Sequence, residues 1–121
     1  MARKKVSIVL GSGGARGITH IGVLKYLTAH NYEIDEVVGC SIGALIGAAF
    51  AEGKIEALST WMSHLTRREV FRLMDFSNPR FGLLKGDRVL STLQQIFEDT
   101  KIENLGLKYT AVATDLVHEC E

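Results

Sequence analysis

The chain has 121 residues, with 14 lysines and arginines balanced by 14 aspartates and glutamates, and it is 46% hydrophobic and 23% charged. These values fit one modest domain with a single core, and no basic stripe interleaved with aromatic residues points to a nucleic-acid partner. Two cysteines do not form a disulfide framework, and four scattered histidines lack zinc-site spacing, so we expect a cytoplasmic protein without a metal or other cofactor.

The first elements of the chain are a strand, a glycine-rich loop and a helix. A β-branched, apolar run at Lys5–Leu10 predicts a buried strand. It leads into Gly11–Gly17, a loop that contains four glycines. Apolar residues at helical spacing then predict a helix from Ile18 to about His30.

A second strand and a second helix follow in the same order. The strand is expected at Asp35–Gly39 and the helix at Ile42–Glu52, with Gly53 placed to end it. The apolar stretch Val37–Ala51 has 15 residues, fewer than the roughly 20 that span a bilayer. Repeated strand–helix order predicts a parallel sheet with helices packed on it.

The second half of the chain has weaker patterns. Lys54–Glu69 has amphipathic spacing and predicts one helix, whereas Phe71–Leu84 predicts a loop or short helical turns near the entrance to the site. A third strand is expected at Lys108–Thr114, with Asp115 at its end. Asp87 is expected to cap a further helix, whose apolar face would be Val89, Leu90, Leu93, Ile96 and Phe97.

The pentapeptide Gly39-Cys40-Ser41-Ile42-Gly43 is a Gly-x-Ser-x-Gly motif between a predicted strand and a predicted helix. In that setting the motif is typical of a nucleophile elbow, which holds the middle serine in a strained turn and needs small flanking residues. Ser41 is therefore the candidate nucleophile. Two alternatives remain: Ser41 could simply cap the second helix, or the neighbouring Cys40 could be the nucleophile.

The loop Gly11–Gly17 has two interpretations. It could bind a dinucleotide, although Gly17 comes one residue late for G-x-G-x-x-G and no acidic residue follows the second strand. It could instead form an oxyanion hole, because consecutive glycine amides can point at one spot. The carboxyl ends of adjacent parallel strands are neighbours, so the second interpretation places this loop beside Ser41.

Several segments together resemble the patatin-like phospholipase family, most closely its bacterial single-domain members. The resemblance covers essentially the whole chain, in order. It is carried by Gly11–Gly17, Ile21–Leu24, Gly39–Leu45, Gly82–Asp87 and Ala113–Leu116.

The resemblance implies a three-layer α/β/α hydrolase with a mainly parallel sheet that cleaves fatty-acyl esters of lipids with a Ser-Asp dyad and no metal. It makes Ser41 the nucleophile, assigns the oxyanion hole to the amides around Gly13, Gly14 and Ala15, and gives Gly11, Gly17, Gly39 and Gly43 to the turns. The family aspartate lies in an Asp-Gly-Gly or Asp-Gly-Ala motif, and no Asp-Gly pair occurs in this sequence. Residues 1–121 are therefore expected to be the amino-terminal part of one such domain, with an incomplete sheet and little activity alone.

Three functions remain open at this stage. The first is a lipid acyl hydrolase, with possible peripheral contact to a membrane and self-association through surfaces left bare. The second is an inactive homologue that serves as a binding module, which the missing aspartate favours. The third is a Rossmann-type nucleotide-binding module. Asp115 precedes the family's catalytic aspartate in the resemblance and is expected to be structural.

Overall fold

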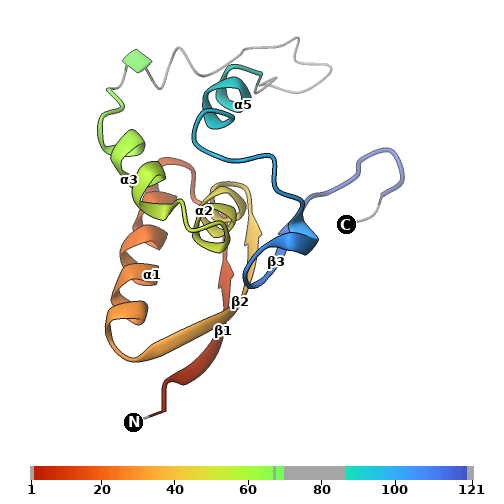
Figure 1. Ribbon diagram of the computed structural model, residues 1–121. Helices are drawn as coiled ribbons and strands as arrows, with labels where there is room; N and C mark the ends of the chain where they lie inside the picture. Colours follow the sequence, from red (N-terminus) through yellow and green to blue (C-terminus); the bar gives the residue numbers. More distant parts are fainter. Residues whose placement is uncertain (1, 67, 70–86, 120–121) are drawn as a thin grey trace.

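The computed structural model describes residues 2–66, 68–69 and 87–119. Within these residues, strands and helices alternate along the chain (Figure 1). The elements are β1 (Lys4–Leu10), the 3-10 helix η1 (Gly14–Ile18), α1 (Thr19–Ala29), β2 (Tyr32–Cys40), α2 (Ile42–Ala51), α3 (Ile55–Ser63), α5 (Asp87–Leu93), the 3-10 helix η2 (Ile102–Asn104) and β3 (Lys108–Val112).

The three strands form one parallel sheet in the order β1-β2-β3. Leu10 pairs with Gly39, and Cys40 pairs with Val112, so the strands end at the same edge of the sheet. The glycine-rich loop therefore leaves this edge next to Ser41. The connection from β1 to β2 and the connection from β2 to β3 move across the sheet in the same direction. Such connections between parallel strands are right-handed, so their helices lie on the same face of the sheet.

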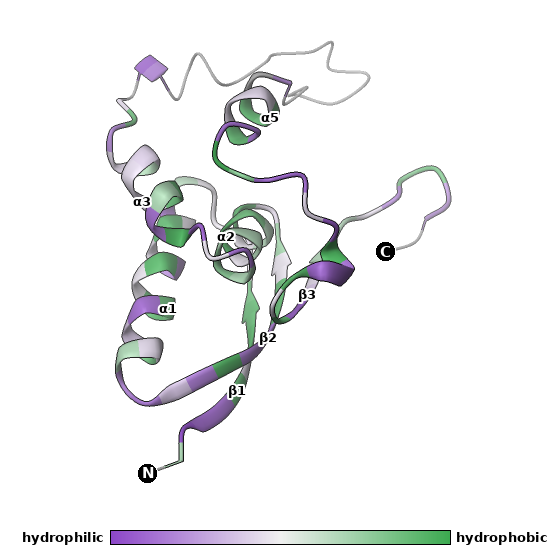
Figure 2. Cartoon of the chain, in the orientation of Figure 1, coloured by the Kyte–Doolittle hydropathy of each residue, from purple (hydrophilic) through white to green (hydrophobic). Residues whose placement is uncertain are grey.

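One core lies between that face and the helices. Val37 of β2, Leu24 of α1 and Ile46 of α2 are fully buried in it, and Leu58 of α3 closes it. Figure 2 shows hydrophobic colouring along α2 and the later parts of β1 and β2, and hydrophilic colouring where the two strands begin. The helix-covered face of the strands' carboxyl ends thus holds the edge that carries Ser41, because close packing leaves little freedom there.

The opposite face of the sheet is open. Val9 has 78% of its surface exposed, and Ser7, Cys40 and Thr110 are exposed as well. Among the described helices, none covers this face. The predicted α/β class with a parallel sheet is confirmed, and the sheet is incomplete: one helical layer of the three-layer arrangement is present in the described residues.

The predicted helix Lys54–Glu69 is wrong in its length, because α3 ends at Ser63. The Thr60 carbonyl accepts the Ser63 hydroxyl at 2.8 Å and lies 2.7 Å from His64 Nδ1, so side chains occupy the helix end. A second helical start follows: the Glu69 amide donates to Thr66 Oγ1 at 3.3 Å, and Thr66 donates to the Glu69 carboxylate at 2.7 Å. This reciprocal pair is a capping box.

Smaller differences concern element ends. Gly53 has a φ of +73° directly after α2, which confirms it as the terminator. β3 ends at Val112, two residues earlier than expected, and Asp115 lies in the turn beyond it. Asp87 begins α5, but Leu90 is 59% exposed and does not belong to the buried face assigned to it. The expectation for Phe71–Leu84 lies outside the described residues.

Candidate active site

Ser41 occupies a strained turn between β2 and α2. Its φ is +55° and its ψ is −125°, a conformation that L-residues rarely adopt. Such a residue costs about 1–3 kcal/mol and persists only where the surrounding structure enforces it. The expected elbow geometry is present at this position.

Two glycines make the turn possible. A Cβ on Gly39 would lie 2.5 Å from Ala44 Cα, and a Cβ on Gly43 would lie 2.1 Å from the Leu10 carbonyl oxygen. Both contacts are with backbone, so no side chain can rotate away to make room. The strand, the turn and the first turn of α2 are therefore packed at backbone distance around Ser41.

The Ser41 side chain is exposed and does not cap α2. The first helical hydrogen bonds run from the amides of Ala44 and Leu45 to the Ser41 carbonyl, at 2.9 and 3.2 Å. The hydroxyl forms no capping hydrogen bond. Ser41 occupies the N-cap position of α2, but the interpretation that its side chain caps the helix is wrong, since a capping serine accepts a bond from a backbone amide of the first turn.

Tyr109 of β3 packs against α2. Its hydroxyl donates to the Ala44 carbonyl at 2.8 Å, and its ring lies beside Gly47, where a Cβ would be 3.2 Å from Cε2. Burial raises the pKa of the Tyr109 phenol above its usual value, because the ionised form loses hydration. β3 thus fixes the helix that begins at the elbow.

The glycine-rich loop turns sharply after β1. Gly14 has a φ of +53°, and the Arg16 amide donates to the Gly13 carbonyl at 3.1 Å. This bond is the first of η1, so the amides of Gly14 and Ala15 precede it and are not used by it. Amides at the start of a helical turn have no helical carbonyl to bind and suit an anion.

The loop and the elbow meet directly after Ser41. Gly17 is buried against Ile42, where a Cβ would lie 2.2 Å from Cγ2. A Cβ on Gly43 would lie 2.7 Å from the Gly11 carbonyl oxygen. The expected proximity of the two motifs is therefore present, with contacts to the residues that follow Ser41.

Cys40, the alternative nucleophile, contacts the loop from the strand. The Ser12 hydroxyl donates to its Sγ at 3.6 Å. Cys40 is exposed and is the last residue of β2, and it is not among the described residues with a positive φ. The strained apex of the turn thus belongs to Ser41.

One of the four histidines reaches this region. His20 Nε2 lies 2.9 Å from the Gly11 carbonyl oxygen. His30, by contrast, has its Nδ1 2.8 Å from the Tyr26 carbonyl oxygen, and its ring stacks on the Tyr26 ring. Residue order gave no sign of the His20 contact, although side chains in a first helical turn lean toward the preceding loop.

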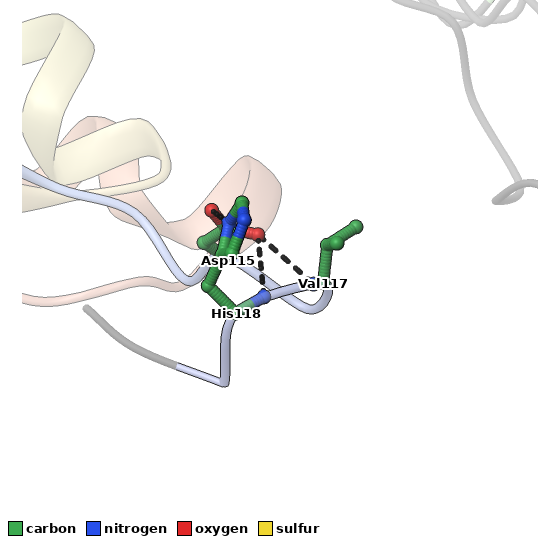
Figure 3. Close-up of polar contacts among 3 residues, drawn as sticks. All are labelled: Asp115, Val117 and His118. Atoms are coloured by element: carbon green, nitrogen blue, oxygen red, sulfur yellow. Dashed lines mark hydrogen bonds and ion pairs between the residues drawn. The ribbon is translucent and has the colours of Figure 1, made fainter.

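Asp115 binds its own turn. Its Oδ1 accepts the Val117 and His118 amides at 2.9 and 3.2 Å, and His118 Nδ1 lies 2.6 Å from Oδ2 (Figure 3). The hydrogen bond from His118, followed by those two amides, holds the pKa of Asp115 below its usual range. These contacts are those of a turn-capping aspartate.

The carboxylates on β2 do not lie where a ribose would bind. Asp35 and Glu36 are in the middle of the strand, and Ser7 Oγ lies 3.5 and 3.3 Å from their oxygens. The part of the chain that the structure describes contains no group of three His, Cys, Asp or Glu side chains able to hold a metal ion. Likewise, none of its helices has the length and apolar character needed to cross a membrane.

Known proteins resemble this chain along most of its length. The patatin-like phospholipase family profile matches residues 8–118. An uncharacterized NTE family protein of Mycobacterium tuberculosis is 41% identical over 93% of this chain and 31% of its own length. Patatin-like phospholipase domain-containing protein 7 of Rattus norvegicus is 34% identical over 92% of this chain and 8% of its own length.

A similar match links the chain to neuropathy target esterase sws of Drosophila persimilis, which is 35% identical over 95% of this chain and 8% of its own length. The chain therefore spans about a third of the mycobacterial relative and less than a tenth of the two animal proteins. No solved structure matches it significantly.

Proposed function

The chain belongs to the patatin-like phospholipase family, and we propose that it carries the nucleophile and the oxyanion hole of a serine hydrolase that cleaves fatty-acyl esters of lipids. The conformation of Ser41 carries the proposal. A φ of +55° is retained although its hydroxyl caps nothing. Backbone strain at a residue whose side chain makes no capping hydrogen bond is typical of catalytic residues.

In the proposed reaction, Ser41 Oγ attacks the ester carbonyl carbon. The carbonyl oxygen becomes an oxyanion that accepts hydrogen bonds from the amides of Gly13, Gly14 and Ala15, and each such donor contributes about 3 kcal/mol to related reactions. The hydroxyl proton passes to a base and then to the leaving alcohol, which departs and leaves an acyl-serine. Water attacks this acyl group in the second half of the reaction and restores Ser41.

The proposed base is an aspartate outside these 121 residues. The sequence has Asp35, Asp75, Asp87, Asp99 and Asp115, and a glycine follows none of them. Asp115 is already bound to its own turn. Loss of the catalytic aspartate from a serine hydrolase lowers the turnover rate by a factor on the order of 10⁴. We therefore expect little turnover from the chain alone.

The substrate proposed is a lipid or another fatty-acyl ester at a membrane surface, reached from the cytoplasm by peripheral contact. The matched family and the names of its relatives support a lipid substrate. We also expect self-association, because the open sheet face exposes Val9. Light scattering checks this point, and a single monomeric species at high concentration would contradict it.

The test is covalent labelling by a fluorophosphonate, which mimics the tetrahedral intermediate. The chain should label slowly, because an oxyanion hole without a full catalytic set retains part of its effect. Labelling should vanish in Ser41→Ala and persist in Ser7→Ala, an exposed serine on β1. Absence of labelling both in this chain and in a longer form that contains the family aspartate would instead support an inactive binding module.

A further inference from the structure

His20 lies where the glycine-rich loop begins. It is the second residue of α1, and its Nε2 is 2.9 Å from the Gly11 carbonyl oxygen. The preceding residue binds the other end of the loop, since Thr19 Oγ1 donates to the Arg16 carbonyl at 2.9 Å. Two neighbouring side chains of one helical turn therefore hold both ends of the loop.

The contact fixes which ring nitrogen donates. A carbonyl oxygen only accepts hydrogen bonds, so Nε2 must carry the proton, and the neutral ring is then protonated at Nε2. The same carbonyl oxygen also lies close to α2, because a Cβ on Gly43 would lie 2.7 Å from it. The Gly11 carbonyl is thus fixed between the imidazole and the helix that starts at Ser41.

A fixed carbonyl fixes the amide that follows it. The peptide unit is planar, so orienting the Gly11 carbonyl also orients the Ser12 amide and the direction in which the chain enters Gly13. Gly13, Gly14 and Gly17 add no side chain that could restrict the loop, and glycine permits many backbone conformations. The bond from the Arg16 amide to the Gly13 carbonyl restricts the second half of the loop, and contacts from outside the loop must restrict its start.

We infer that His20 is a positioning residue of the oxyanion hole: its Nε2–H holds the Gly11 carbonyl and thereby aims the amides of the glycine-rich loop at the carbon that Ser41 attacks. His20 touches no reacting atom. This inference rests on the proposed function, because it assigns the loop its catalytic use. The hydrogen bond itself is independent of that function.

The test compares His20→Leu, which removes the donor, with His20→Gln, whose amide nitrogen can stand in for Nε2. His30→Leu is the matched control, because His30 also bonds a backbone carbonyl but lies away from the loop. The rate constant for fluorophosphonate labelling of Ser41 should fall about tenfold in His20→Leu, the effect of one well-placed hydrogen bond. His20→Gln should restore it to within about threefold, and His30→Leu should leave it unchanged.

Nitrogen NMR of the intact wild-type chain gives a readout that needs no activity. The His20 ring should show an Nε2–H proton that exchanges slowly with water, whereas a ring without this bond exchanges too fast to be seen. Equal labelling rates for wild type and His20→Leu, or failure of His20→Gln to restore the rate, would overturn the inference. A ring that carries its only proton on Nδ1 would do the same. If Ser41 labels neither in this chain nor in a longer form that contains the family aspartate, the proposed function fails, and the ring signal still decides whether His20 holds the loop.

Discussion

The elbow at Gly39–Gly43 and the turn at Ala113–Glu119 lie at the ends of neighbouring parallel strands, at the same edge of the sheet, and each contains a candidate for a catalytic role from the sequence. Ser41 has a strained backbone and a hydroxyl with no capping bond. Asp115 has a carboxylate that accepts hydrogen bonds from Val117 and His118. The Ser41 hydroxyl thus caps no helix, whereas the Asp115 carboxylate holds its own turn.

The packing around the two segments differs in the same way. Gly39 and Gly43 lie at backbone distance from their neighbours, which enforces the conformation of Ser41. In the other turn, Leu116 is 86% exposed and Val117 is 83% exposed. Close packing can hold a strained backbone such as that of Ser41, and a loosely packed turn must be held by its own hydrogen bonds.

Gly43→Ala should have the largest effect. The added methyl would lie 2.1 Å from the Leu10 carbonyl oxygen, so β1 and α2 must separate. We expect the free energy of unfolding to fall by about 3 kcal/mol in chemical denaturation. The matched control is Gly22→Ala in α1, where nothing lies within 4 Å of the new Cβ. It should gain about 0.5–1 kcal/mol, and equal losses in the two variants would contradict the packing account.

Ser41→Gly should stabilise the chain. Glycine adopts a φ of +55° without strain, so the free energy of unfolding should rise by about 1 kcal/mol while fluorophosphonate labelling is lost. Ser41→Ala keeps the strain and should leave stability nearly unchanged. Thermal unfolding of both variants measures the difference, and a less stable Ser41→Gly would mean that the turn is not strained.

Tyr109→Phe should cost about 1 kcal/mol, because the Ala44 carbonyl loses its donor. The folded chain also holds the Tyr109 pKa above its usual value, so it binds this proton more tightly than the unfolded chain does. Stability is therefore lost as pH rises past about 10 toward the raised value. Alkaline denaturation should be steeper in wild type than in Tyr109→Phe, and identical pH profiles would contradict this reasoning.

Breaking the contact between Asp115 and His118 should have the smallest effect on stability, because the Asp115 side chain is exposed to solvent. Its lowered pKa means that its contribution is present above about pH 4 and is lost as pH falls through the lowered value. His118→Ala should raise the titration midpoint of the Asp115 carboxyl in NMR, since His118 is the largest cause of the shift. An unchanged midpoint would show that the pair does not form in solution.

Local patterns in the sequence predicted much of this arrangement. The apolar run of β1, the Gly-x-Ser-x-Gly motif and Gly53 each act over a few residues, so their structural consequences could be inferred before any fold was known. The capping box at Thr66 and Glu69 is equally local, and the Thr-x-x-Glu spacing could have revealed it. The helical periodicity of Lys54–Glu69 concealed it.

Contacts between distant residues could not be predicted in this way. Tyr109 bonds Ala44 across 65 residues, a contact that depends on the pairing of β3 with β2. Leu90 lies within α5 and fits an apolar helical face by spacing, yet it is 59% exposed, and spacing alone does not tell which side of the helix packs on the core. The contact of His20 with Gly11 depends on how the loop folds back, which spacing alone does not determine.

The central claim is that Ser41 is the nucleophile, and peptide mapping of the labelled chain tests it most directly. Trypsin releases the peptide Tyr26–Lys54, in which Ser41 is the only serine. After reaction with a fluorophosphonate, mass spectrometry should find the adduct on this peptide, and fragmentation should place it on Ser41. An adduct on Cys40, or on Ser12 in the loop peptide, would contradict the account.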